Sequence, residues 1–226
     1  MIRVLVLSPH PDDESIGCGG TLRKHISQGD EVRLIFLTSG EQGVHGCSPA
    51  ETVLIREREA AKAARILHLS HVEFWREPDG AVRASRRLAA KLRNTVREWN
   101  PKLIYVPHDG EMHPDHRASA RLVRRALLDL AASVRPIVRM FEVWTPMQQI
   151  DEVVDISEYM ETKLAAVRAY KSQCAIMRFD EAVLGLDRYR GEMHSGWPAA
   201  RYAEIFSEWK SKGQLRNTKQ RGRNGN

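Results

Sequence analysis

Short apolar runs alternate with longer segments of helical pattern along the chain. The run IRVLVLS (2–8) is apolar almost throughout, which is typical of a strand covered by helices on both faces. Further strands are expected at 31–38, 71–75, 102–107, 137–144 and 152–156, and helices at 21–29, 49–67, 85–99, 117–132, 157–170 and 199–210. Strands that alternate with helices favour a mainly parallel sheet between two helix layers. The predicted fold class is therefore α/β, a Rossmann-like three-layer sandwich.

The composition predicts one domain followed by a basic tail. The chain has 226 residues, and α/β domains often reach this size without dividing. Six of the 35 basic residues lie between 210 and 226, where there is no acid, which leaves 29 basic residues against 29 acidic ones. We therefore predict a single domain over 1–210 and a disordered, solvated tail over 211–226. Because the body is close to neutral, nucleic acid is not an expected partner.

The sequence also predicts a cytoplasmic location. No apolar run approaches the roughly 20 residues that span a bilayer. The N-terminal run is too short for a secretion signal and lacks a cleavage site. Cys18, Cys47 and Cys174 are widely spaced, which favours reduced thiols over a disulfide framework. The oligomeric state is left open, and a homo-oligomer is compatible with the sequence.

Polar segments follow four of the predicted strands. They are HPDDE (10–14), TSGEQG (38–43), EPDG (77–80) and HDGEMHPDH (108–116). In sheets of this kind, ligands bind beyond the carboxyl ends of the strands. We therefore expect the four segments to share one rim of the sheet and to form the functional site.

Two of these segments contain pairs of residues suited to a metal ion. His10 and Asp13 are three positions apart, and His113 and His116 have the same spacing after the fourth strand. Imidazole and carboxylate ligands suit zinc, and a catalytic zinc keeps one position open for water. A divalent cation would also offset the repulsion within the acidic run 12–14. Two histidines with one carboxylate also suit ferrous iron, so the metal is left open between Zn²⁺ and Fe²⁺.

The motifs, taken in order, resemble those of a known enzyme family. HPDDE followed by IGCGGTL, TSGEQG, a helix with Arg-x-x-Glu, and HPDH is similar to the zinc-dependent N-acetylglucosamine deacetylases. These include the de-N-acetylases of glycosylphosphatidylinositol, mycothiol and bacillithiol synthesis. The resemblance covers most of residues 2–130, and it implies an enzyme, a metal-dependent N-deacetylase.

The resemblance implies roles for the residues of the two paired motifs. The first histidine and second aspartate of HPDD bind zinc in the family, as does the last histidine of HPDH, so His10, Asp13 and His116 are the implied ligands. The first aspartate is the general base in the family, which implies this role for Asp12. The expected reaction is attack of an activated water on an acetamide carbonyl, giving acetate and a free amino sugar.

Further roles follow from the same resemblance. His113, in its protonated form, is expected to stabilise the tetrahedral intermediate, with Asp115 as its orienting partner. Arg56 matches an arginine that contacts substrate in the family. Glu41 and Asp79 fall in loops that hold sugar hydroxyls in relatives.

Some positions depart from the family pattern or have simpler explanations. Some relatives have a tyrosine two residues before HPDH, where this chain has Glu111, so tyrosine assistance to the oxyanion is in doubt. Trp144 and three other tryptophans (Trp75, Trp99, Trp209) fit packing positions. The irregular stretch 178–200 could form a wall of the substrate pocket.

Three alternatives to the deacetylase fit parts of the sequence. A dinucleotide-binding oxidoreductase is suggested by Gly17, Gly19 and Gly20 after a strand, but Leu22 stands where the fingerprint needs glycine. A non-catalytic binding module could use the basic tail. A zinc hydrolase could act on another amide or on an ester. The substrate is expected to be a small molecule or glycoconjugate, with the group attached to the sugar left open.

Overall fold

The strands and helices alternate over almost the whole chain, as the apolar runs predict. The computed structural model describes residues 1–209, so the predicted tail (211–226) lies outside the described residues. The elements up to β5 are β1 (Arg3–Ser8), α1 (Asp13–Ser27), β2 (Glu31–Phe36), α2 (Pro49–Leu67), β3 (His71–Phe74), α3 (Arg86–Trp99), β4 (Leu103–Pro107), α4 (Pro114–Leu128), η1 (Ala132–Val134) and β5 (Ile137–Phe141). The remainder are β6 (Glu152–Asp155), α5 (Met160–Val167), α6 (Lys171–Cys174), α7 (Phe179–His194) and β7 (Ala203–Glu208).

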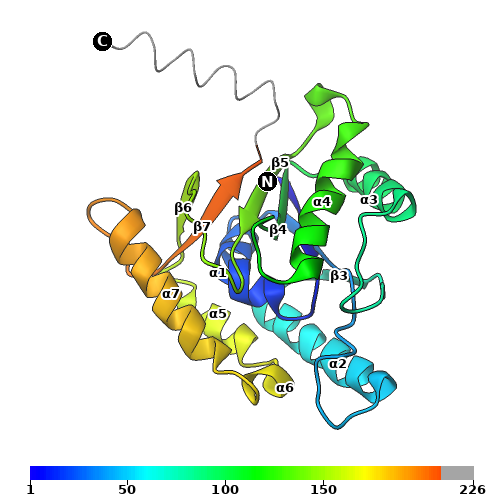
Figure 1. The fold of residues 1–226 in the computed structure, drawn as a ribbon. Helices are drawn as coiled ribbons and strands as arrows, with labels where there is room; N and C mark the ends of the chain where they lie inside the picture. Colours follow the sequence, from blue (N-terminus) through cyan, green and yellow to red (C-terminus); the bar gives the residue numbers. More distant parts are fainter. Residues whose placement is uncertain (210–226) are drawn as a thin grey trace.

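The strands form one seven-stranded sheet in the order β3-β2-β1-β4-β5-β7-β6. Strands β1 to β5 pair in parallel, whereas β7 pairs antiparallel with both β5 and β6. The chain proceeds outward from β1 to β3 on one side, and β4 then returns to the other side of β1 (Figure 1). This reversal creates a switch point between β1 and β4, where α/β sheets hold their ligands.

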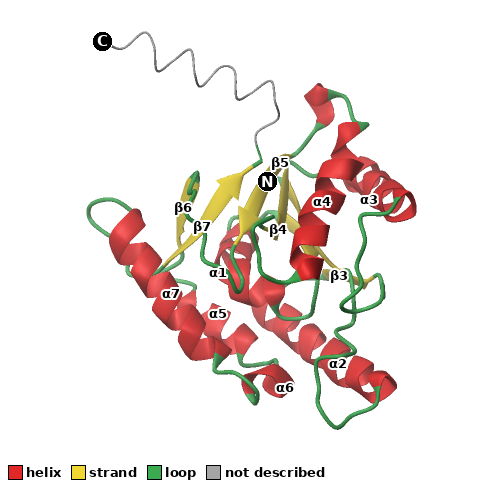
Figure 2. Cartoon of the chain, in the orientation of Figure 1, coloured by secondary structure: helices red, strands yellow, loops and turns green. Residues whose placement is uncertain are grey.

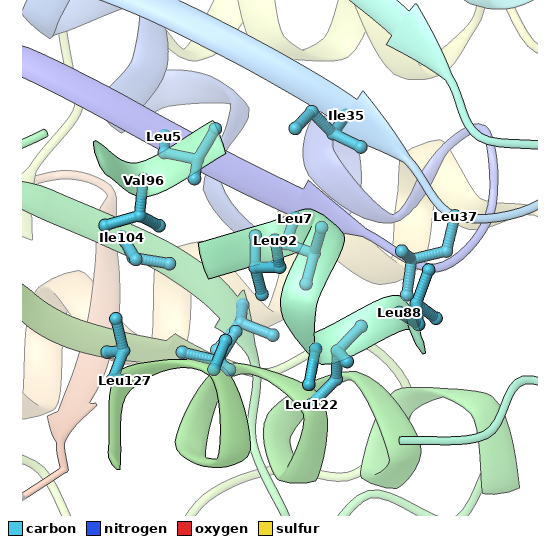
Figure 3. Packing of buried hydrophobic residues seen from close by; sticks show 14 of the residues in the cluster. Leu5, Leu7, Ile35, Leu37, Leu88, Leu92, Val96, Ile104, Leu122 and Leu127 are labelled. Carbon is cyan, nitrogen blue, oxygen red and sulfur yellow. The ribbon is translucent and has the colours of Figure 1, made fainter. Parts of the chain in front are cut away.

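Helices cover both faces of the sheet, which confirms the predicted three layers (Figure 2). Alternate residues of β1 point to opposite faces: Leu5 and Leu7 pack with α3 and α4, whereas Val4 and Val6 pack with α1, α2 and α5. Figure 3 shows the first of these two clusters. Because both faces are buried, the β1 run is apolar rather than alternating.

Helix α1 begins earlier than the sequence predicts, and its glycines serve packing. The predicted helix began at residue 21, but α1 begins at Asp13 and includes the glycine-rich segment. A Cβ on Gly17 would lie 2.1 Å from the ring of Phe141, and one on Gly20 would lie 2.8 Å from Ile156. These glycines therefore bring the helix close to β5 and to the segment directly after β6, which explains them without a dinucleotide.

The last part of the chain differs most from the prediction. The predicted helix at 199–210 is wrong, because residues 203–208 form β7, which lies between β5 and β6. The stretch expected to be irregular contains α7 instead. Pairing with two neighbouring strands overrides the local helical pattern of β7. Among residues 1–209, no helix has the length and apolar character required to cross a bilayer.

Candidate active site

The polar segments that follow β1, β2, β3 and β4 contribute to one cavity at the switch point. Its volume is about 210 Å³. The loop that leads from β1 into α1 supplies the HPDD residues, the last of which begins α1, and the start of α4 supplies the HPDH residues. The cavity is lined by His10, Asp12, Asp13, Gly40, Gln42, Gly43, Arg56, Asp79, Gly80, His113, Trp144 and Gln173.

The side chains of the three predicted metal ligands form a triangle in which Asp13 turns a different carboxylate oxygen toward each histidine. His10 Nδ1 lies 3.2 Å from Asp13 Oδ2, His116 Nε2 lies 3.3 Å from Asp13 Oδ1, and the two imidazole nitrogens are 3.3 Å apart. Tetrahedral zinc bonds of about 2.0–2.2 Å place neighbouring ligand atoms about 3.3–3.5 Å apart. The three side chains therefore fit a single dication. His113 also belongs to a group with His10 and His116 whose ligand atoms lie within 4.8 Å of one another.

The charges of this triangle also suit a cation. Burial would lower the pKa of His116, but the Asp13 and Glu111 carboxylates raise it to about 9. Burial would raise the pKa of Asp13, but His116 and His10 hold it well below its ordinary value. Without a metal, the histidines thus carry protons that balance the carboxylates, and a dication replaces those protons when it binds.

Asp12 adopts an unusual backbone conformation beside this triangle. Its φ is 124°, in the region that favours glycine. Its backbone N–H donates to Glu14 Oε2 (3.2 Å), and Arg56 Nη2 lies 3.4 Å from its carboxylate while donating to the carbonyl of Pro11. Burial raises the pKa of Asp12 to about 7, an effect that Arg56 partly offsets. The surroundings thus hold a strained residue in place at the cavity.

The three consecutive acids point in three directions. Asp13 faces the histidines and Asp12 faces Arg56, whereas Glu14 is buried behind them. Glu14 Oε1 accepts from Tyr170 Oη (2.7 Å) and from Ser15 Oγ (2.6 Å). Each acid therefore has its own partners, and Glu14 is not directed at the predicted metal position.

The carboxylate of Asp115 faces His10 rather than His113, so only the backbone N–H of Asp115 serves the orienting role that the sequence-based expectation gave to the residue. Its Oδ2 lies 3.2 Å from His10 Nε2, and its carboxylate accepts the backbone N–H groups of Gly80 (2.8 Å) and Val82 (3.0 Å). Asp115 therefore supports His10, the first predicted ligand. The side chain reaches that position because α4 begins at Pro114 and aims its first turn at the β1 loop.

The surroundings of His113 favour its neutral form over the protonated form expected from the sequence. Burial lowers its pKa, and the nearby His10 and His116 lower it further. Its Nδ1 accepts the backbone N–H of Asp115 (3.2 Å), which leaves the remaining ring proton on Nε2. Its position at the start of α4 also disfavours a positive charge. His113 can thus donate a hydrogen bond while uncharged.

The predicted substrate-binding residues occupy different positions relative to the cavity. Asp79 lines it, with Oδ1 3.2 Å from His10 Nε2 and Oδ2 accepting the Gln42 N–H (3.0 Å). Arg56 also lines it, and within the described chain its Nε and Nη1 have no hydrogen-bond partner. Glu41 instead supports the Asp79 loop, because its carboxylate accepts the Asp79 N–H (2.8 Å). Gln42, next to Glu41, lines the cavity in its place.

Two lining residues were not found by sequence reasoning. Trp144 was assigned to packing, but 46% of it is exposed, and its ring lies 5.6 Å from His113 and 6.0 Å from His116. Gln173, on α6, donates to the carbonyl of Gly43 (2.9 Å). No local pattern marks either residue. In the 178–200 stretch, Arg190 pairs with Glu142 (2.8 Å), away from the lining residues.

A larger cavity of about 480 Å³ lies beside the site, between the loop after β5 and β7. Its lining includes His108, Asp109 and Arg124, of which Asp109 and Arg124 form an ion pair of 2.6 Å. The smaller cavity is the better candidate, because it contains converging imidazole and carboxylate groups and a buried guanidinium, two of whose nitrogens have no hydrogen-bond partner within the described residues.

Comparisons with known proteins agree with the motif pattern. Residues 5–127 match the family model "PIG-L: GlcNAc-PI de-N-acetylase". The diacetylchitobiose deacetylase of Thermococcus kodakarensis is 30% identical over 76% of this chain and 70% of its own length. The structure of the N,N'-diacetylchitobiose deacetylase from Pyrococcus horikoshii matches with a TM-score of 0.80 and 26% identity, over 92% of this chain and 83% of that one.

A third comparison bears on the fold alone. GalB, the 4-carboxy-2-hydroxymuconate hydratase of Pseudomonas putida KT2440, matches with a TM-score of 0.80 at 24% identity. The match covers 94% of this chain and 98% of that one. Proteins with this architecture therefore include one that is named for a different reaction.

Proposed function

Because the chain belongs to the PIG-L family of GlcNAc-PI de-N-acetylases, we propose that it is a metal-dependent N-deacetylase that releases acetate from an N-acetylglucosamine-type compound. The observation that carries the proposal is the triangle of His10, Asp13 and His116 beside Asp12, at one cavity. Since one fold supports several reactions, this site rather than the architecture supports the proposal.

We propose Zn²⁺ as the metal, held by His10, Asp13 and His116. The distances between the imidazole nitrogens and the Asp13 carboxylate oxygens, and the mixture of nitrogen and oxygen ligands, support this choice. Zinc would lower the pKa of a bound water and polarise the amide carbonyl. Ferrous iron would suit the same ligand set, so metal analysis of the purified protein is part of the test.

Asp12 is the proposed general base. Its carboxylate lines the cavity beside the ligand set, and Arg56 and Glu14 fix its position. It accepts a proton from the attacking water and delivers a proton to the departing amine, so that acetate and a free amine leave. Proton transfer by such a group accelerates reactions by about 10²–10⁴-fold.

His113 is the proposed donor to the developing oxyanion. Its Nε2–H is free to point into the cavity because Nδ1 is engaged by the Asp115 N–H. As a neutral donor, it stabilises negative charge on the carbonyl oxygen without losing its own proton. One such donor contributes about 2.7–4 kcal/mol to transition-state stabilisation.

Polar groups that line the cavity together with Trp144 support recognition of a sugar. Asp79, Gln42 and the unpartnered nitrogens of Arg56 can accept from and donate to hydroxyl groups. Glu41 is proposed to act through Asp79 rather than on the sugar. A cytoplasmic location remains part of the proposal, with Cys18, Cys47 and Cys174 all free.

The direct test is a screen of N-acetylated sugars for acetate release. Zinc-loaded protein would be incubated with N-acetylglucosamine, diacetylchitobiose and N-acetylglucosaminyl conjugates, with and without a chelator. We expect acetate and a free amine in equal amounts, loss of activity with the chelator, and recovery on adding zinc. Zinc-loaded protein that releases acetate from none of these compounds would contradict the proposal.

A further inference from the structure

Glu111 is one of the most enclosed acids in the chain, and one of its oxygens anchors a loop. Its side chain is 0% exposed. Oε1 accepts three successive backbone N–H groups, from Val143 (2.7 Å), Trp144 (3.0 Å) and Thr145 (3.2 Å). A carboxylate in this position fixes the segment 143–145, and with it the tryptophan that lines the cavity.

The other oxygen of Glu111 faces the predicted ligand His116. Oε2 lies 3.5 Å from His116 Nδ1, and in the described part of the chain neither atom has a shorter hydrogen bond. The opposite nitrogen, Nε2, faces His10 and Asp13. At 3.5 Å the two atoms lie slightly farther apart than in a usual hydrogen bond.

We propose that Glu111 is a positioning residue that couples the metal ligand to the substrate cavity. It holds His116 with its proton on Nδ1, so that Nε2 is free for the metal, and it ties this ring to the loop of Trp144. Histidines that bind metals generally donate their other N–H to such a partner. The inference rests on the proposed metal ligands, and it assigns a role to Glu111 at a position where some relatives have a tyrosine.

The substitution Glu111→Gln separates the two contacts. The amide oxygen can still accept from the three N–H groups, which would place the NH₂ group against His116 Nδ1. Two donors then face each other, which favours movement of the ring proton to Nε2. A proton on Nε2 competes directly with the metal.

Glu142→Gln is the matched control. Glu142 is also buried and anchors the same loop, since its carboxylate accepts the Met147 N–H (2.7 Å) and pairs with Arg190 (2.8 Å). Its contacts are thus with Met147 and Arg190 rather than with a predicted ligand. Any loss of metal affinity caused by general loosening of the loop would appear in both variants.

Zinc affinity would be measured by competition with a fluorescent chelator. We expect E111Q to bind zinc about 10–100-fold more weakly than wild type, and E142Q to bind it as wild type does. Equal affinities in E111Q and wild type would overturn the role of Glu111 alone. A wild-type protein that binds no zinc would overturn the proposed ligand set and this role together.

A measurement on the wild type covers the case in which E111Q fails to fold. Nitrogen-15 NMR of histidine in the zinc-loaded protein reports which ring nitrogen of His116 carries the proton. We expect a proton on Nδ1 and the metal on Nε2. Coordination through Nδ1 would overturn the proposal.

Discussion

Two clusters of buried charges lie along helix α1, and only one of them has the properties of an active site. The first is the triangle of His10, Asp13 and His116 at the start of the helix. The second is Lys163, whose Nζ lies 2.7 Å from both Asp187 and Glu204. Both clusters are shielded from water and rich in carboxylates.

The difference between the clusters is the source of positive charge. Lys163 is a permanent cation, and although burial would lower its pKa, Asp187 and Glu204 raise it. In the first cluster, the positive charge is carried by imidazoles that a metal can replace. The first cluster also borders a cavity of about 210 Å³, against about 60 Å³ beside the second. Buried charge alone therefore does not identify a site.

The largest expected effect is on catalysis at the first cluster. Asp12→Ala removes the proposed base, so we expect kcat to fall by about 10²–10⁴-fold while zinc remains bound. Asp187→Asn, in the second cluster, serves as the control and should keep wild-type kcat. Steady-state acetate release and metal content would be measured together. A near-wild-type kcat in Asp12→Ala would contradict the proposal that Asp12 is the general base.

The second cluster should affect stability instead. Lys163→Met leaves two buried carboxylates without their cation, so we expect the free energy of unfolding to fall by about 3–5 kcal/mol. Urea unfolding measures this, and Lys62→Met, at an exposed position of α2, is the control. If the variant were as stable as wild type but lost zinc, the distinction between the clusters would fail.

Stability should also depend on pH through the second cluster. Burial raises the pKa of Asp187 to about 7, and Lys163 only partly offsets this because it also pairs with Glu204. The folded state thus binds more protons than the unfolded state between the ordinary pKa of 3.8 and about 7. The Asp187 contribution to stability is therefore lost as pH rises through this range, by at most about 1.4 kcal/mol per unit.

Urea unfolding of wild type and Asp187→Asn over a pH series isolates this contribution. We expect wild type to lose stability relative to the variant as pH rises. Parallel pH dependence in the two proteins would show that Asp187 has an ordinary pKa.

The smallest effect concerns the wall of the cavity. Trp144→Ala should raise KM for a glycoside by up to about tenfold and leave kcat nearly unchanged, because an aromatic contact contributes about 0.5–1.5 kcal/mol. Trp144→Phe should retain most of the affinity. A fall in kcat at constant KM would instead indicate that Trp144 positions His113.

The sequence predicts those parts of the molecule that depend on local pattern. The β1 run is apolar because both faces of the strand are buried, so its place in the sheet could be recognised from the chain alone. Since the carboxyl ends of β1 and β4 share one rim, the meeting of His10 with His116 also followed from the strand order.

The remaining features depend on contacts between distant segments. β7 has a helical pattern, but hydrogen bonding to β5 and β6 decides its conformation. The support of His10 by Asp115 depends on the direction of the first turn of α4. The exposure of Trp144 depends on the three hydrogen bonds to Glu111. Neither the spacing of residues nor the composition predicts these contacts between distant segments.

The parallel pairing of β1 with β4 has a consequence for the nascent chain. His10 and Asp13 are synthesised about a hundred residues before His116, on the far side of two complete strand–helix units. A growing polypeptide that has not yet docked β4 contains only part of the proposed ligand set. Under that proposal, metal binding would follow the pairing of β1 with β4 and would occur late in biogenesis.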